Sequence, residues 1–139
     1  MVRRSSKKHD CEWLLTTHGE VDPKEISAVS TKPFKESLWF KFEPVIVHVI
    51  CMDMPWARRL LDACQRAGLK GSGIVSISTR PLVKVEGSDR IETLLGKNGN
   101  LIVSSEYLTA LSESANEKMA RNSNRIERLR REIIGRKKG

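Results

Sequence analysis

The most informative segment of the chain covers residues 39–51 and reads Trp-Phe-Lys-Phe-Glu-Pro-Val-Ile-Val-His-Val-Ile-Cys. It is the most apolar region of the chain, yet it contains Lys41, Glu43 and His48. Burying such side chains costs several kcal/mol unless they are paired, so they are the first candidates for chemistry. Pro44 cannot donate a hydrogen bond to a neighbouring strand, and we expect it to separate a strand over 37–43 from one over 45–51.

His48 lies in the second of these strands, where alternate residues share a face. It shares its face with Ile46 and Ile50, and valines at positions 45, 47 and 49 form the other face. Because both faces are apolar, the strand is predicted to be central in its sheet, with His48 buried on at least one flank. Two interpretations stay open: a core histidine bonded to a backbone carbonyl, and a general base that acts near neutral pH.

Lys41 and Glu43 have the same parity, so they share a face if their strand is regular. One interpretation is a surface ion pair. The other is an acid and a cation that line a pocket, where Glu43 accepts a hydrogen bond from a substrate N–H.

Helix signals surround this stretch. A cap at Asp22 followed by proline predicts a helix to about residue 29. Asp53 and Gly68 predict a second helix over 55–67, and Ser104 predicts a long third one. The apolar face of the second helix is predicted to contain Trp56, Leu60, Leu61, Cys64 and Ala67. The third has an apolar stripe at helical spacing: Leu108, Leu111, Ala115, Met119, Asn122, Ile126, Leu129 and Ile133.

Further strands are predicted over 11–18, 74–78, 82–86, 90–95 and 100–103. This order indicates an α+β fold, in which a mixed, mostly antiparallel sheet is flanked by helices and a long helix ends the chain. The 139 residues suffice for one domain. We expect a basic N-terminal tail over 1–10, a single α+β domain over 11–134 and a basic C-terminal tail over 135–139.

The charge pattern points to an anionic partner. The formal net charge is +8, and residues 118–139 contain nine Lys and Arg but two Glu. Such a balance favours nucleic acid, and a solvated helix face is the alternative. No apolar run is long enough to span a bilayer, and no signal peptide is evident, so we expect a cytoplasmic protein. The three cysteines are far apart in sequence, which favours reduced core thiols and no metal site.

Residues 70–73, Lys-Gly-Ser-Gly, form a candidate anion nest, because successive backbone N–H groups can converge on a phosphate or carboxylate. The alternative is a simple tight turn. The chain has no Walker loop, Gly-x-Gly-x-x-Gly fingerprint or Ser/His/Asp order, so a nucleotide-like cofactor would bind in a non-Rossmann manner.

Six segments in order resemble one family, the wybutosine-synthesis N4-methyltransferases. They are Trp-Leu-Leu-Thr-Thr-His at 13–18, Lys-Phe-Glu-Pro at 41–44 with His48, Gly-Ser-Gly-Ile at 71–74, Gly-Asn-Leu-Ile-Val-Ser-Ser-Glu-Tyr at 99–107, Ala-Asn-Glu-Lys-Met at 115–119, and Arg-Ile-Glu-Arg at 125–128. The resemblance spans roughly residues 11–130 and implies transfer of a methyl group from S-adenosylmethionine to N4 of a 4-demethylwyosine precursor at position 37 of phenylalanine tRNA.

The resemblance also implies roles for individual residues. Glu43 and His48 would be catalytic, orienting the nitrogen or taking its proton. The backbone of Gly71, Ser72 and Gly73 would hold the cofactor carboxylate or a substrate anion. The remaining predicted substrate and tRNA contacts are Trp13, His18, Lys41, Lys70 and Arg80. A protein partner or a second copy of the chain is expected to bind along the C-terminal helix. No membrane partner is expected.

Departures from the family pattern leave alternatives open. The family has an N-terminal segment with a Ser-x-Cys-x-Gly-Arg motif that this chain does not match, and Glu86 and Leu94 stand where the family often has arginine and proline. We therefore expect a fragment or misassigned start, a chain that works with a second polypeptide, or a paralogue. The alternative function is that of a non-catalytic tRNA-binding paralogue or an accessory subunit.

Overall fold

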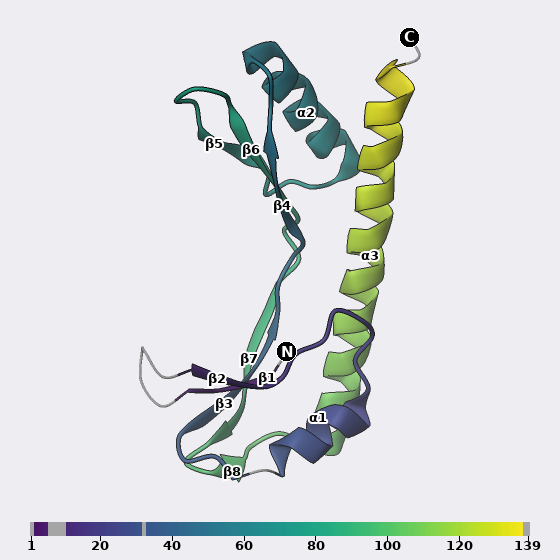
Figure 1. Ribbon diagram of the computed structural model, residues 1–139. Coiled ribbons are helices and arrows are strands. Elements are labelled where there is room, and N and C mark those ends of the chain that lie inside the picture. The colour runs from purple at the N-terminus through teal and green to yellow at the C-terminus, as the bar shows by residue number, and fades with distance from the viewer. Residues whose placement is uncertain (1, 6–10, 32, 138–139) are drawn as a thin grey trace. The chain divides into compact units, whose positions relative to one another are not determined.

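A computed structural model of the protein describes residues 2–5, 11–31 and 33–137, which form eight strands and three helices (Figure 1). The strands are β1 Val2–Ser5, β2 Cys11–Leu15, β3 Ser37–Phe42, β4 Ile46–Ile50, β5 Gly73–Ser76, β6 Leu82–Glu86, β7 Ile91–Lys97 and β8 Asn100–Leu101. The helices are α1 Pro23–Ser30, α2 Met54–Ala67 and α3 Ser105–Lys137. The described strands pair antiparallel throughout and divide between two sheets. Together with the three helices, this confirms the predicted α+β class, and α3 confirms the predicted long last helix.

The chain divides into two compact units. Among the described residues, the first contains those up to Glu43 together with Arg90–Met119, and the second contains Pro44–Asp89 and those from Ala120 onward. The α3 helix therefore contributes its first half to one core and its second half to the other. The tail predicted over residues 1–10 contains β1, which pairs with both β2 and β3.

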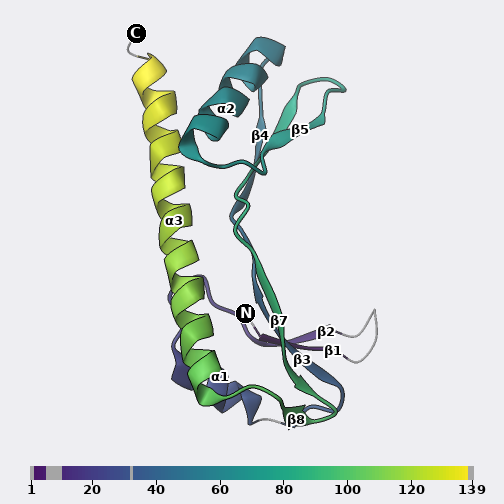
Figure 2. The ribbon, with the colours of Figure 1, turned by 180° about the vertical axis from the view of Figure 1, so that it is seen from behind.

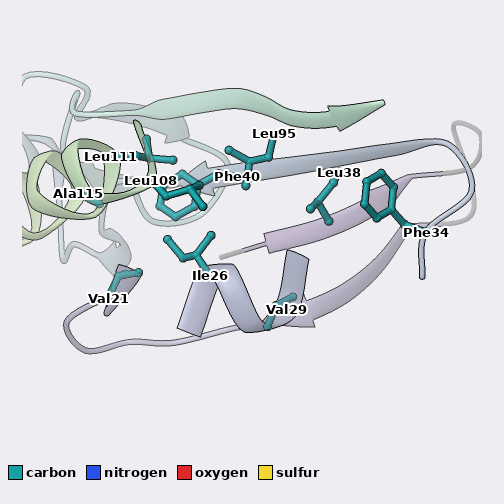
Figure 3. Packing of buried hydrophobic residues seen from close by; sticks show 10 residues of the cluster. All are labelled: Val21, Ile26, Val29, Phe34, Leu38, Phe40, Leu95, Leu108, Leu111 and Ala115. Atoms are coloured by element: carbon teal, nitrogen blue, oxygen red, sulfur yellow. The ribbon is translucent and has the colours of Figure 1, made fainter. Parts of the chain in front are cut away.

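The first unit contains a five-stranded sheet in the order β2-β1-β3-β7-β8. Figure 3 shows side chains of α1 and of the first half of α3 packed against β3 and β7. Ile26, Leu38 and Leu95 are fully buried in this core. Asp22 caps α1 as predicted, with Oδ1 accepting a hydrogen bond from the Lys24 amide at 2.9 Å. The core thus joins the first half of α3 to the sheet.

The second unit contains the sheet β4-β6-β5. In Figures 1 and 2, α2 lies between this sheet and the second half of α3. Asp53 caps α2 through a 3.0 Å hydrogen bond from the Trp56 amide, and Gly68 ends it with φ of 87°. Both predicted helix boundaries are confirmed, because each depends on local backbone geometry.

The predicted central position of residues 45–51 is wrong, since β4 is an edge strand and β6 is the centre of its sheet. Ile46, His48 and Ile50 are exposed, and 68% of Ile50 is accessible to solvent. The reason is that α2 covers only one face, where Val83 and Val85 of β6 are buried. Trp56, predicted on the buried face of α2, is also exposed.

Candidate functional site

A row of three residues crosses the open face of the three-stranded sheet. His48 lies opposite Lys84, and Lys84 lies opposite Gly73. Directly opposed residues have Cβ atoms about 4.5–5.5 Å apart, so the side chains of His48 and Lys84 start from neighbouring positions on this face. A Cβ atom built on Gly73 would meet nothing within 4 Å. The row therefore has open space beside a base and a cation.

Glu86 anchors the ammonium group of this row. Its Oε2 lies 2.8 Å from Nζ of Lys84, and only 5% of the residue is exposed. The ion pair with the Lys84 ammonium group offsets the free-energy cost of removing the Glu86 carboxylate from water. Sequence reasoning treated Glu86 only as a departure from the family pattern. The signal for a paired site was the alternation of charge and valine over 82–86.

The turn over residues 71–73 is bonded to the end of β6. The amide of Gly71 donates to the carbonyl of Glu86 at 3.0 Å, and the amide of Ser72 donates to the carbonyl of Leu69 at 3.3 Å. Ser72 Oγ accepts from the Glu86 amide at 2.9 Å. A Cβ atom on Gly71 would lie 2.9 Å from the carbonyl oxygen of Gly87, so the close approach requires glycine. This geometry favours the tight turn, and the cofactor role of these residues stays a prediction.

The other predicted residues of the second unit are exposed. His48 lies on β4, Lys70 in the turn after α2, and Arg80 in the bend before β6. Each can be reached by a partner from solvent. Their predicted roles rest on the family resemblance.

The remaining predicted residues belong to the first unit. Lys41 pairs with Glu92 of the neighbouring strand at 3.6 Å, a different partner from the Glu43 considered in the sequence. Glu43 and His18 are exposed, Glu43 after β3 and His18 in the bend after β2. The backbone of Trp13 lies in β2, and its side chain is outside the described part of the structure. Glu43 and His48 thus belong to different units.

A pocket of about 560 Å³ lies in the second unit, at the end of β4 and beside α2 and α3. Its size and apolar lining are typical of small-molecule sites. Arg59 and Glu132 are its charged members, and the guanidinium carbon of Arg59 lies 5.1 Å from the centre of the Trp56 ring. The lining consists of Val49, Ile50, Cys51, Met52, Trp56, Arg59, Leu60, Ala63, Glu132 and Ile133. Sequence reasoning missed this pocket, although Trp56, Arg59 and Leu60 share a helix face at spacings of three and four.

The thiols of Cys51 and Cys64 are buried and free. Burial raises the pKa of Cys51, and the Asp53 carboxylate raises it further. Burial also raises the pKa of Cys64, and a hydrogen bond with Ser72 partly offsets this. Both cysteines belong to the core of the second unit, which confirms the predicted packing role for these two; the side chain of Cys11 lies outside the described part of the structure. Within the described ranges, no group of three or more His, Cys, Asp and Glu could hold a metal ion.

The charge of +8, the open face with His48 and Lys84, and the pocket define the class: a basic α+β protein with a polar sheet face and an apolar pocket. The sequence profile described as "Methyltransferase TYW3" matches residues 2–135. The chain belongs to this methyltransferase family, as the six segments indicated.

Named relatives agree with this membership. The chain is 34% identical over 127 residues to "tRNA(Phe) 7-((3-amino-3-carboxypropyl)-4-demethylwyosine(37)-N(4))-methyltransferase 1" of Pyrococcus horikoshii, covering 91% of this chain and 65% of the relative. It is 33% identical over 124 residues to "tRNA wybutosine-synthesizing protein 3 homolog" of Xenopus laevis, covering 88% of this chain and 49% of the relative. The chain thus spans somewhat less than two thirds of the archaeal protein and about half of the vertebrate one.

Solved structures have the same fold. The PH1069 protein from Pyrococcus horikoshii is similar with a TM-score of 0.89 and 31% identity, covering 96% of this chain and 69% of that one. A hypothetical protein from Aeropyrum pernix has a TM-score of 0.80 at 24% identity over 94% of this chain and 80% of its own, a likeness of fold alone.

Proposed function

We propose that this chain methylates N4 of the 4-demethylwyosine precursor at position 37 of phenylalanine tRNA, with S-adenosylmethionine as the methyl donor. The observation that carries the proposal is the match of the methyltransferase family over residues 2–135. The names of the archaeal relatives supply the substrate and the position. The charge of +8 agrees with a tRNA substrate.

The donor set of the pocket fits an amino-acid-bearing nucleoside. Trp56 offers an exposed aromatic face to a planar base, and Arg59 offers a guanidinium group to a carboxylate. S-adenosylmethionine, when bound, supplies an electrophilic methyl group. We therefore assign its binding to the pocket residues of the second unit.

Methylation of a nitrogen needs positioning more than strong acid–base catalysis. Residues around the nitrogen would hold it in line with the methyl group of the donor, and one of them would take the N–H proton. His48, exposed on the open sheet face, is the first candidate to accept that proton, and Glu43 is the second.

The test is transfer of labelled methyl from S-adenosylmethionine to phenylalanine tRNA that lacks this methylation. We expect label in the tRNA, and a higher KM for the donor in Trp56→Ala. Met54→Ala is the matched control, since Met54 lies in the same helical turn but not in the pocket lining. Absent transfer and absent donor binding by calorimetry, with tRNA binding retained, would establish the non-catalytic alternative.

We also propose a cytoplasmic location and a protein contact along α3. The free thiols of Cys51 and Cys64 support a reducing compartment. Exposed Ile133 and Ile134 support a contact near the end of α3. None of the helices in the described residues is long and apolar enough to cross a membrane. Cell fractionation and light scattering test these two proposals: secretion contradicts the first, and a monomer that captures no partner contradicts the second.

A further inference from the structure

A second hollow, of about 400 Å³, lies in the second unit between α2 and the last turns of α3. Three arginines line it: Arg66 from α2, and Arg128 and Arg131 from α3. Arg128, Arg131 and Gly135 lie three, four and seven positions apart, so they share one face of α3. We call this hollow the arginine notch.

The arginine notch keeps an excess of positive charge. Its one carboxylate, Glu132, lies 2.9 Å from Nε of Arg66. Arg131 pairs through Nε with Glu127 at 3.6 Å. Among the side chains that the structure describes, no carboxylate forms an ion pair with Arg128. Arg128 thus lines the hollow without a paired carboxylate among the described side chains.

Other arginines of α3 have structural partners instead. Asp89 lies 2.9 Å from Nη1 of Arg125 and 3.7 Å from Nε of Arg121. Arg130 pairs with Glu127 at 3.2 Å and does not line the notch. The arginines between Arg121 and Arg131 are therefore unevenly paired around the helix, and the unpaired Arg128 lies at a concave surface.

Space at the rim allows a ligand to enter. A Cβ atom built on Gly135 would meet nothing within 4 Å, so the notch is open on that side. Guanidinium groups from two helices offer several N–H donors to one anion, and arginine binds phosphate oxygens through paired N–H groups. Hence the notch fits a singly charged, oxygen-rich anion such as a phosphodiester.

We propose that the arginine notch formed by Arg66, Arg128 and Arg131 binds a backbone phosphate of the tRNA. This inference rests on the proposed function, because it takes tRNA as the substrate. It assigns a contact that positions the RNA and reads no sequence. The notch is separate from the Trp56 pocket, although Glu132 lines both.

The experiment measures tRNA affinity over a range of salt concentrations for Arg128→Gln. Losing one phosphate contact should weaken binding and lower the slope of log K against log salt by about 0.7 to 0.9. Arg130→Gln is the matched control, because it removes the same charge from the same helix outside the notch. Its slope should remain closer to that of the wild type. An unmodified transcript of the same tRNA should show the same differences, because no modified base is read.

Gly135→Glu is the second variant, and it removes no existing side chain. It adds a carboxylate at the open rim, where no neighbour clashes, and replaces a helix-interior glycine. We expect it to weaken tRNA binding at low salt with no loss in Tm, whereas Gly135→Gln should bind as the wild type does. This pair separates a charge effect from a folding effect.

Several results would overturn the inference. They are equal slopes for Arg128→Gln and wild type, the absence of wild-type tRNA binding, or a lower Tm in Arg128→Gln with an unchanged slope. Loss of binding to poly-glutamate in Arg128→Gln, with tRNA binding unchanged, would assign the notch to an acidic protein.

If the slope falls but wild type transfers no methyl group, the inference stands and the proposed activity fails. If methyl transfer occurs and the slope is unchanged, the reverse holds.

Discussion

His48 and Val83 allow a direct test of what is exposed and what is buried in the three-stranded sheet. Val83 is fully buried in β6, and His48 is exposed on the edge strand β4. For Val83→Ala, the lost transfer free energy of about 0.8 kcal/mol per methyl group, with a cavity term, predicts a loss of about 2 to 3 kcal/mol. For His48→Ala we expect a change within about 0.5 kcal/mol, as for exposed sites without special contacts.

The assay is urea unfolding followed by tryptophan fluorescence and circular dichroism, with methyl transfer measured on the same preparations. Val83→Ala shows that the assay detects a loss of core packing in this sheet. We expect His48→Ala to retain the wild-type midpoint and to lose methyl transfer. That combination separates a role in the reaction from a role in folding.

Two outcomes would refute this reasoning. A loss of more than about 1 kcal/mol in His48→Ala would mean that the histidine is packed in a core, as the apolar pattern of residues 45–51 first indicated. Unchanged stability with unchanged methyl transfer would leave His48 as an ordinary surface residue. The proposal for the base would then pass to Glu43.

Three further predictions concern stability, each measured by urea unfolding. Gly68→Ala should cost about 1 to 2 kcal/mol, because Gly68 has φ of 87° and a Cβ atom would lie 3.2 Å from Nε of Arg125; a change near zero contradicts this. Asn122→Leu should stabilise by about 1 kcal/mol, because Asn122 is 7% exposed and its Oδ1 has no hydrogen-bond partner in the described residues; destabilisation would show that the amide is needed. Because the folded-state pKa of Cys64 lies above its ordinary value of 9.0, this thiol leaves the free energy of unfolding unchanged below pH 9.0 and lowers it as pH rises from there through the folded-state pKa. Cys64→Ala should make that decrease with pH less steep, and an equally steep decrease would contradict the assignment.

The helices were predicted well because their signals are local. Asp22 and Asp53 accept hydrogen bonds from amides two and three residues ahead, and Gly68 adopts a backbone conformation that glycine favours. The predicted stripe on α3 is buried at Leu108, Leu111, Ala115, Asn122 and Leu129. It ends before Ile133, which is 40% exposed.

The candidate site was predicted less completely. The family resemblance named His48 and Gly73, and the structure places both in one row with Lys84. It did not bring out the pocket around Trp56 or the ion pair of Lys84 with Glu86. Those features depend on contacts between segments far apart in the chain, which a reading of local patterns does not contain.

Local patterns in the amino-acid sequence were enough to predict the class of fold, the helix boundaries and, through six ordered segments, the methyltransferase family. Only the tertiary structure decided that residues 46–50 form an edge strand, because strand order depends on pairing between distant segments. The apolar pattern of residues 45–51 is the same whether one face or both faces of the strand are covered. A single helix, α2, covers one face, and this leaves His48 at the surface.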